Sequence, residues 1–277
     1  MWHYRESGTG PPLVLLHGIG MSHATWRAVI PFLSSTRRVI AFDVAGFGET
    51  PPLASRVAPT LTHLAESLAE TLEDLSLREP VDIAGNSLGG AIALELAKLG
   101  RARSVVAISP ACLWRQAPPF HVRYVFDALC SGSNTCPALL KLAMRVGLLR
   151  ELIFAVPMSI GSRRMPASEA ANAIDDLRRS IAFWETFEAT RVPFTDGTAI
   201  DVPVTIAFGT CDWLLPRWSR VREQLPVHTR WLEPKGWGHV PLWADPRGVA
   251  ALILDGISSC RPFAPSEPGA ASKWRMI

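Results

Sequence analysis

The stretch VDIAGNSLGGAIALELAKLG occupies residues 81–100 and decides how the rest of the chain is interpreted. It begins as a short apolar strand, passes through GNSLGG at residues 85–90, and continues as a helix rich in alanine and leucine. Glycine is favoured where the backbone turns sharply or where another segment comes close. A serine between glycines at such a corner is either a turn residue or an exposed nucleophile.

The pattern Gly-x-Ser-x-Gly centred on Ser87 is weak when taken alone, and its position between a strand and a helix strengthens it. In a nucleophile elbow the serine lies on a tight, strained turn that exposes its hydroxyl. The amides and the dipole at the start of the following helix favour negative charge at the same place. The alternative is an ordinary glycine-rich connection that contains an incidental serine.

A serine hydroxyl attacks a carbonyl at neutral pH only when a base takes its proton and an acid orients that base. The best base is His239, in the glycine-rich stretch EPKGWGHVPLWADP, and the best acid is Asp212, a few residues beyond the apolar run VPVTIAF. Both are predicted at the sheet edge that carries Ser87. The chain order Ser87, Asp212, His239 differs from that of other serine-triad folds.

The segment HGIG at residues 17–20 also follows a predicted strand. Its backbone is expected to supply the N–H of Ile19, which with the N–H of Leu88 would form an oxyanion hole. We interpret His17 as a residue that shapes this loop by hydrogen bonding, in preference to a catalytic base.

Apolar runs typical of buried strands recur along the chain and alternate with segments of helical period. The predicted strands are 13–16, 38–42, 81–84, 104–108 and 202–208, and the clearest helices are 62–75 and 88–99. This alternation predicts an α/β protein with a mostly parallel sheet covered on both faces. We expect a core domain of residues 1–111 and 192–260, a helical cap at 112–191, and a mobile tail at 261–277.

Composition excludes several classes of function. The 277 residues carry 28 Lys+Arg and 25 Asp+Glu, and the basic residues are dispersed, so no nucleic-acid partner is expected. Five dispersed cysteines without a C-x-x-C pair fit no zinc site, and no metal or organic cofactor is expected. The apolar stretch 137–160 is interrupted by charges, which predicts an amphipathic helix and no stable membrane insertion. We expect a cytoplasmic monomer or homodimer.

Five motifs in order, LVLLHGIG, VIAFDVAGFGET, VDIAGNSLGGAIAL, FGTCDWLLP and GWGHVPLWADP, resemble the landmarks of the α/β-hydrolase superfamily over nearly the whole chain. The resemblance implies an eight-stranded, mostly parallel sheet flanked by helices, with a helical cap after the sixth strand. It also implies that the loop around Asp43 is structural. GNSLGG with a short HGIG is similar to the branch of small carboxylesterases and carbon–carbon bond hydrolases.

These features predict a hydrolase that cleaves carboxylic esters of hydrophobic acyl or aryl groups through an acyl-enzyme on Ser87. A serine at the elbow argues against epoxide hydrolases and haloalkane dehalogenases of this fold, which need a carboxylate there. The alternatives are a carbon–carbon bond hydrolase, a cofactor-free perhydrolase, a hydroxynitrile lyase, a ligand receptor and a catalytically inactive interaction module. The aromatic residues predicted to contact a small-molecule ester are Trp26, Trp114, Tyr124, Trp184 and Trp213.

Overall fold

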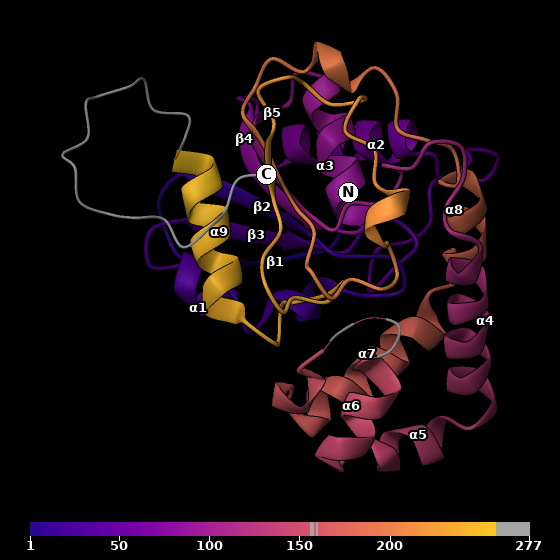
Figure 1. Ribbon diagram of the computed structural model, residues 1–277. Helices are drawn as coiled ribbons and strands as arrows, with labels where there is room; N and C mark the ends of the chain where they lie inside the picture. The colour runs from indigo at the N-terminus through magenta and orange to yellow at the C-terminus, as the bar shows by residue number, and fades with distance from the viewer. Residues whose placement is uncertain (156–157, 159, 259–277) are drawn as a thin grey trace.

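The computed structural model describes residues 1–155, 158 and 160–258, and a single sheet forms its centre (Figure 1). Within these residues the sheet has seven strands in the order β1-β3-β2-β4-β5-β6-β7. The strands are β1 (Tyr4–Ser7), β2 (Pro12–Leu16), β3 (Arg38–Phe42), β4 (Val81–Asn86), β5 (Ala102–Ile108), β6 (Val204–Ala207) and β7 (Arg230–Leu232). β1 is antiparallel to β3, and all other neighbours are parallel.

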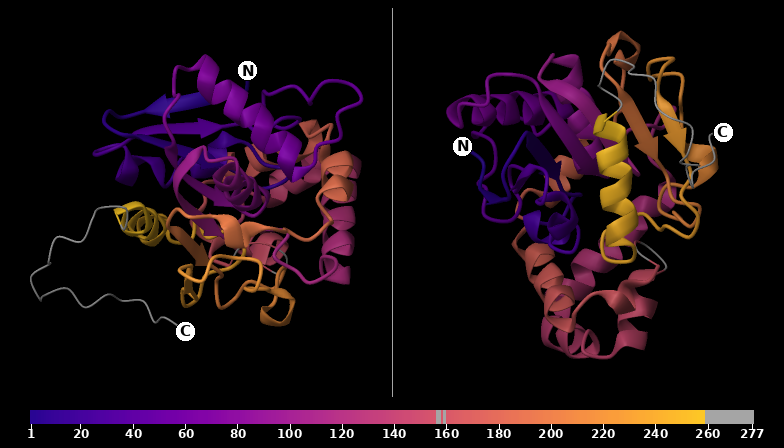
Figure 2. Two further views of the ribbon diagram at one scale, coloured as in Figure 1. Left: turned by 90° about the horizontal axis from the view of Figure 1, so that it is seen from above. Right: turned by 90° about the vertical axis from the view of Figure 1, so that its left-hand side faces the viewer.

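Helices cover both faces of the sheet because alternate strand residues point to opposite sides. Val14 and Leu16 of β2 join the core beneath α2 (Leu61–Asp74) and α3 (Leu88–Lys98). Leu13 and Leu15 join the core beneath α1 (Ile30–Leu33) and α9 (Pro246–Ser258). Figure 2 shows α9 and α2 on opposite sides of the sheet. The near-continuous apolar strands therefore bury both faces, as the sequence predicted.

All five predicted strands lie in the sheet as β2 to β6, and the two predicted helices are α2 and α3. The expected number of eight strands was wrong for the described residues, which form seven. Five strands, not six, precede the helical insertion. β1 and β7 escaped prediction because β1 (YRES) is a polar, half-exposed edge strand and β7 (RWL) has only three residues.

The chain between β5 and β6 is helical and lies beyond the sheet at the bottom and right of Figure 1. It contains α4 (Phe120–Thr135), α5 (Pro137–Ala143), α6 (Gly147–Ala155), the 3-10 turn η2 (Ser162–Arg164), α7 (Ala167–Arg179) and α8 (Phe183–Ala189). The stretch predicted as one amphipathic helix is divided into α5 and α6. Among the helices described, none has the length and apolarity to cross a bilayer. The predicted tail at 261–277 lies outside the described residues.

Candidate active site

Ser87 lies at the junction of β4 and α3 in a strained backbone conformation. Its φ of 54° and ψ of −115° are unusual for a residue with a side chain. The turn is held because the Ser87 N–H donates to the Ile108 carbonyl at 2.9 Å, and the Ser87 carbonyl accepts from Ala91 and Ala111. Ser87 is the N-cap residue of α3, yet its side chain accepts no capping hydrogen bond from the described chain. The hydroxyl is therefore not committed to a structural role in the helix.

The glycines beside Ser87 are required by close backbone contacts. A Cβ atom added to Gly85 would lie 2.2 Å from the Gly89 carbonyl oxygen, and one added to Gly89 would lie 2.4 Å from the Leu16 carbonyl oxygen. Real Cβ atoms do not approach backbone oxygens this closely. The first turn of α3 thus packs directly against the ends of β2 and β4, which is the close helix–strand packing that the sequence predicted.

Asp212 and His239 come from the loops after β6 and β7, and the structure brings them into contact. His239 Nδ1 lies 3.2 Å from Asp212 Oδ1 and 3.1 Å from Asp212 Oδ2, and both residues are buried. The Leu215 N–H donates to Asp212 Oδ1 at 3.0 Å. The opposite ring nitrogen, His239 Nε2, is buried and has no hydrogen-bond partner among the described residues. His239 is therefore oriented on one side and available on the other.

The charge state of Asp212 follows from its neighbours. Burial opposes ionisation of the carboxyl, but the charge and hydrogen bond of His239 and the N–H of Leu215 outweigh it and keep the pKa of Asp212 below its ordinary value. The carboxylate is therefore ionised near neutral pH. In that state it accepts the Nδ1–H of His239 and favours the tautomer whose Nε2 is free to accept a proton.

Asn86 is a positioning residue that the sequence reasoning did not assign. Its side-chain amide donates to the Ile108 carbonyl at 3.0 Å and to the His239 carbonyl at 2.9 Å. One buried side chain thus joins the end of β4 to the end of β5 and to the loop that carries His239. Its position directly before the serine was the available signal.

Ser87 and His239 line one cavity of about 40 Å³. Ile19 and Leu88, the two residues predicted to supply the oxyanion hole, also line it. The remaining wall comes mainly from the helical insertion and the Asp212 loop, and includes Trp114, Val122, Phe126, Phe187, Thr190, Arg191, Leu214 and Leu215. The cavity is therefore apolar apart from the candidate catalytic groups and a few polar residues at its edge.

A larger apolar cavity of about 100 Å³ adjoins the first. It does not include Ser87, but Ile19 and Phe126 line both cavities. Met21, Leu129, Phe154, Met158, Leu177 and Phe183 contribute to its wall. The smaller cavity is the candidate reaction site because it contains the nucleophile and the base, and the larger one is an adjoining space for an apolar group.

Of the five predicted substrate contacts, only Trp114 lines the cavity with Ser87. Trp26 ends the 3-10 turn η1 (His23–Trp26) in the connection after β2, and it is fully buried in the core on the α1 and α9 side of the sheet. Tyr124 and Trp213 are 69% and 53% exposed. Trp184 packs against Phe183 and Phe187 without lining either cavity. Those four assignments are corrected here, because aromatic composition does not indicate which way a side chain points.

His17 shapes the loop that carries Ile19, as the sequence interpretation expected. Its Nδ1 is 2.7 Å from the Gly18 carbonyl, and its Nε2 accepts the Val44 N–H at 2.9 Å. Burial lowers the pKa of His17, which keeps the ring neutral and fixes these two roles. A Cβ on Gly18 would lie 3.3 Å from the Ser87 Cβ, so the loop passes directly beside the serine.

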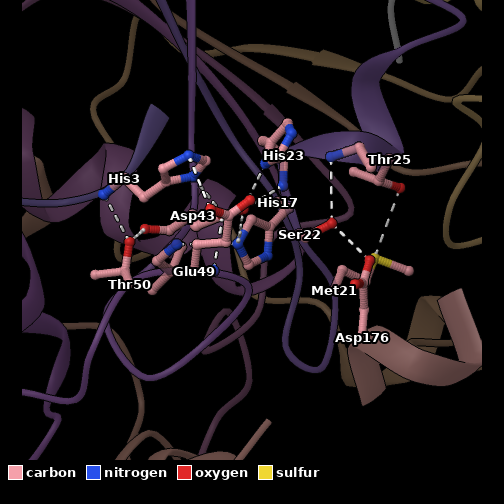
Figure 3. A network of polar contacts seen from close by, with 12 residues as sticks. His3, His17, Met21, Ser22, His23, Thr25, Asp43, Glu49, Thr50 and Asp176 are labelled. Carbon is pink, nitrogen blue, oxygen red and sulfur yellow. Dashed lines mark hydrogen bonds and ion pairs between the residues drawn. The ribbon is translucent and has the colours of Figure 1, made fainter. Parts of the chain in front are cut away.

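Asp43 organises a second polar network below this loop (Figure 3). Its carboxylate accepts from the N–H groups of His23 and Glu49, and from Nδ1 of His3 at 2.9 Å and of His23 at 3.0 Å. His3, His23 and Asp43 have the composition of a metal site, with ligand atoms within 4.8 Å of one another. Because four N–H donors already satisfy the carboxylate, hydrogen bonding accounts for the cluster, and Asp43 is structural in this arrangement.

Comparison with known proteins agrees with this fold. Residues 13–252 match the family model described as the alpha/beta hydrolase family. "Epoxide hydrolase EphH" of Mycobacterium tuberculosis is 32% identical over 206 residues, which cover 72% of this chain and 95% of that relative. A solved thermophilic esterase from Thermogutta terrifontis superimposes with a TM-score of 0.70 at 21% identity, covering 94% of this chain and 93% of its own.

Other relatives match over a shorter stretch. "Pimeloyl-[acyl-carrier protein] methyl ester esterase" of Aeromonas hydrophila is 46% identical over 90 residues, and "2-hydroxymuconate semialdehyde hydrolase" of Pseudomonas sp. is 42% identical over 97 residues. The matched stretches span 33% of each relative's length and about a third of this chain, 32% and 33%. Because the family model spans most of the sequence and the fold agrees with it, the chain belongs to the α/β-hydrolase family.

Proposed function

We propose that this hydrolase cleaves carboxylic esters of apolar acyl or aryl groups through an acyl-enzyme on Ser87. The observation that carries the proposal concerns His239, which lines the same cavity as Ser87. Asp212 orients the ring through Nδ1, and the buried Nε2 has no hydrogen-bond partner among the described residues. A nucleophile, an oriented base and an apolar cavity are the parts that acyl transfer to water needs.

In the proposed reaction His239 Nε2 takes the Ser87 proton while Oγ bonds to the acyl carbon. The negative charge that develops on the carbonyl oxygen is stabilised by the N–H groups of Ile19 and Leu88, each worth about 3–4 kcal/mol in comparable sites. The tetrahedral intermediate collapses, and His239 returns the proton to the departing alcohol. A water molecule, deprotonated by His239, then attacks the acyl-enzyme and releases the acid and Ser87. Asp212 stabilises the imidazolium at both stages.

The identity of the nucleophile favours esters over epoxides, although one relative is named an epoxide hydrolase. A carboxylate that opens an epoxide forms an ester, which water can cleave. A serine that opened an epoxide would form an ether, and water would not cleave that bond under the same conditions. Relatives on one fold differ in chemistry through such residues, so Ser87 carries more weight than the name.

We further propose that residues 112–191 act as a cap that excludes water from the reaction site. Val122 and Phe126 of α4 and Phe187 of α8 lie over the cavity that contains Ser87. Phe126 packs edge-on against both Phe183 and Phe187, at ring separations of 5.3 and 5.4 Å. This aromatic cluster supports a lid that is joined to the core by apolar contacts.

Carbon–carbon bond hydrolysis is a second candidate because Arg191 lines the cavity with Ser87. Its guanidinium pairs with Glu188 at 2.9 Å and remains 47% exposed, so it offers a positive charge for a substrate carboxylate. Several relatives, such as the 2-hydroxymuconate semialdehyde hydrolase, carry names of that type. We rank it second because the rest of the wall is apolar.

The test is hydrolysis of p-nitrophenyl esters from acetyl to palmitoyl by the wild type and by Ser87→Ala. We expect turnover by the wild type, loss of at least about 10³-fold with Ser87→Ala, and an unchanged melting temperature. Equal turnover by a folded Ser87→Ala variant would remove Ser87 from the mechanism. No ester turnover by the wild type, together with cleavage of a dienoate such as 2-hydroxymuconate semialdehyde, would select the second candidate.

A further inference from the structure

The helices α5 and α6 expose apolar residues on the side that faces away from the protein. Six aliphatic residues between positions 139 and 152 are exposed by 41% to 70% of their surface: Leu139, Leu142, Val146, Leu148, Leu149 and Leu152. Figure 1 and the right-hand view of Figure 2 show these helices at one end of the molecule, away from the sheet. We call these six residues the outer apolar face.

The inner side of the same helices is apolar too. Met144 is fully buried with Ala170 and Ile174 of α7, and Leu140, Ile153 and Phe154 pack against this small cluster. A surface helix of a globular protein normally has one apolar stripe and one polar face, whereas a helix that is apolar all round is buried. α5 and α6 therefore have the composition of buried helices, although one side of each is exposed.

The charged residues of α6 explain how this arrangement arises, because they turn inward. Arg150 is 7% exposed and donates to the carbonyls of Met144 and Arg163. Glu151 accepts from the N–H groups of Gly161 and Arg163 at 2.6 and 2.9 Å. The two residues that would make the outer side polar are thus used to hold the following turn, and leucines take their place outside.

Basic residues flank the outer apolar face. The segment 137–164 contains five basic residues and one acidic residue, Glu151. Two of the five are not part of this rim, because Arg150 is buried and Lys141 pairs with Asp175 of α7 at 2.6 Å. Arg145 is exposed between α5 and α6, and Arg163 is exposed on η2, which packs against α6. Arg164 is also exposed on η2, but its guanidinium donates to the Ala244 carbonyl. An apolar surface with a basic rim is complementary to a bilayer whose headgroups are negatively charged.

We propose that the outer apolar face is a docking surface for a lipid bilayer with anionic headgroups. The leucines would enter the boundary between headgroups and acyl chains, and the arginines would contact lipid phosphates. Exposed apolar residues that gather on one part of a protein surface mark interaction sites. An acidic protein partner would match the charge of the arginines, but it would leave the six exposed aliphatic side chains unexplained. A second copy of the chain would bring its own arginines against those of the first copy, and these like charges would repel one another.

The outer apolar face belongs to the same helical insertion that lines the larger apolar cavity. Phe154 of α6, with Met158 and Met165 nearby in sequence, lines the larger apolar cavity beside the reaction site. Docking through α5 and α6 would therefore bring this cavity close to the bilayer, from which an apolar substrate would enter. This consequence rests on the proposed function, but the docking itself does not.

The experiment measures sedimentation of the full chain with vesicles of phosphatidylcholine alone or mixed with phosphatidylglycerol. We expect the protein to sediment with the mixed vesicles and at least tenfold less with phosphatidylcholine alone. Leu148→Glu combined with Leu152→Glu is expected to reduce binding at least tenfold. The matched control is Val227→Glu, an exposed aliphatic residue elsewhere on the surface, which is expected to bind as the wild type does. Arg145→Gln should weaken binding several-fold and reduce its salt dependence.

Two outcomes overturn the proposal. One is a failure of vesicle binding to depend on the leucines: the wild type does not sediment with the mixed vesicles, or the double leucine variant sediments with them as much as the wild type does. The other is a dimer in sedimentation velocity that dissociates in the double leucine variant, without vesicle binding, which would assign the face to a second copy. Circular dichroism and melting curves establish that the variants fold. Because the readout is binding, a failure here is distinguishable from a failure of ester hydrolysis, and Ser87→Ala should bind vesicles normally.

Discussion

At the scale of single residues, the two ring nitrogens of His239 have different surroundings. Nδ1 contacts both oxygens of Asp212, and Nε2 has no partner in the described part of the chain. A buried polar atom without a partner costs free energy. Other buried atoms of the described residues, such as Trp26 Nε1 and Asn86 Oδ1, also lack a partner, but unlike these two His239 lines the cavity with Ser87. That asymmetry distinguishes His239 from His17, whose nitrogens are both satisfied by backbone groups.

Asp212→Asn tests this asymmetry directly. The amide keeps the size of the carboxyl, but it favours the wrong tautomer of His239 and cannot stabilise the imidazolium. We expect kcat for an activated ester to fall by roughly 10³–10⁴-fold, as in serine proteases with the equivalent change, while the substrate KM changes little. Steady-state kinetics at neutral pH measure the loss. A tenfold effect or less in a folded protein would mean that Asp212 does not orient the base.

The residues of the site were accessible from the sequence to different degrees. Ser87, Asp212 and His239 were predicted because each lies in a short motif at a predicted strand end, and parallel strands bring such ends together. Asn86 was missed because its position beside the serine does not indicate which two carbonyls its amide joins. Four of the five aromatic contacts were misplaced, since the direction of a side chain depends on packing.

At the scale of elements, the elbow depends on the contact between the first turn of α3 and the ends of β2 and β4. Gly89→Ala is expected to destabilise the protein by about 1–3 kcal/mol or more, because the new methyl group meets the Leu16 carbonyl oxygen at 2.4 Å. The backbone cannot move away without displacing Ser87. We therefore expect ester turnover to fall as well, measured beside urea unfolding.

Gly132→Ala in α4 is the matched control for this change. A Cβ at that position would meet only Leu140 Cδ1 at 3.7 Å, which is an ordinary contact. Alanine inside a helix is favoured over glycine by about 0.5–1 kcal/mol, so stability is expected to rise slightly. If both alanine variants changed stability alike, the close approach at Gly89 would not explain why glycine is needed there.

The strands were predictable where burial alone determines their residue pattern. Strands β2 to β6 are apolar on both sides because both faces are covered, and this makes them visible in sequence. The outer side of α5 and α6 was not predictable, because the sequence places charges among the leucines and only tertiary hydrogen bonds turn Arg150 and Glu151 inward. The prediction of one helix over 137–160 was wrong, because the described residues of this stretch form the two helices α5 and α6.

At the scale of the whole molecule, the Asp43 network links β1, β3 and the loop after β2. Burial opposes ionisation of Asp43, but the hydrogen bonds from the side chain and the N–H of His23 and from the N–H of Glu49 lower its pKa far below the ordinary value. A carboxyl with a lowered folded-state pKa stabilises the protein above its unfolded pKa, about 4, and loses that contribution as pH falls toward the folded value.

Asp43→Asn is expected to cost about 3–5 kcal/mol at pH 7, because it removes the charge that the surrounding N–H groups are arranged to bind. The difference from the wild type should begin to shrink as pH falls below about 4, because the carboxyl then becomes protonated in the unfolded chain while it stays ionised in the folded protein. Urea unfolding between pH 7 and pH 3 measures both. Asp201→Asn, at an exposed position, should have little effect at any pH. A constant difference across the range would show that the charge of Asp43 is not the stabilising feature.

The two cavities join the helical insertion to the sheet, and Phe126 of α4 lies between them. Phe126→Ala removes a side chain that is 5% exposed and packs on Phe183 and Phe187. We expect a stability cost of about 3–5 kcal/mol from the cavity that is created. We also expect the spaces of about 40 and 100 Å³ to merge, which would admit a longer acyl chain beside Ser87. The ratio of kcat/KM for p-nitrophenyl octanoate to that for the butyrate should then rise about tenfold, which corresponds to 1.4 kcal/mol.

Phe120→Ala is the matched control, because Phe120 lies at the start of the same helix and is 77% exposed. It should change neither stability nor the ratio of the two esters. A fall in both rates with no change in their ratio, in a folded Phe126→Ala protein, would mean that the larger cavity is not part of the substrate site. A rise in the ratio would instead identify that cavity as the place where the acyl chain extends, since Ile19 is the only other residue in the described part of the chain that lines both spaces.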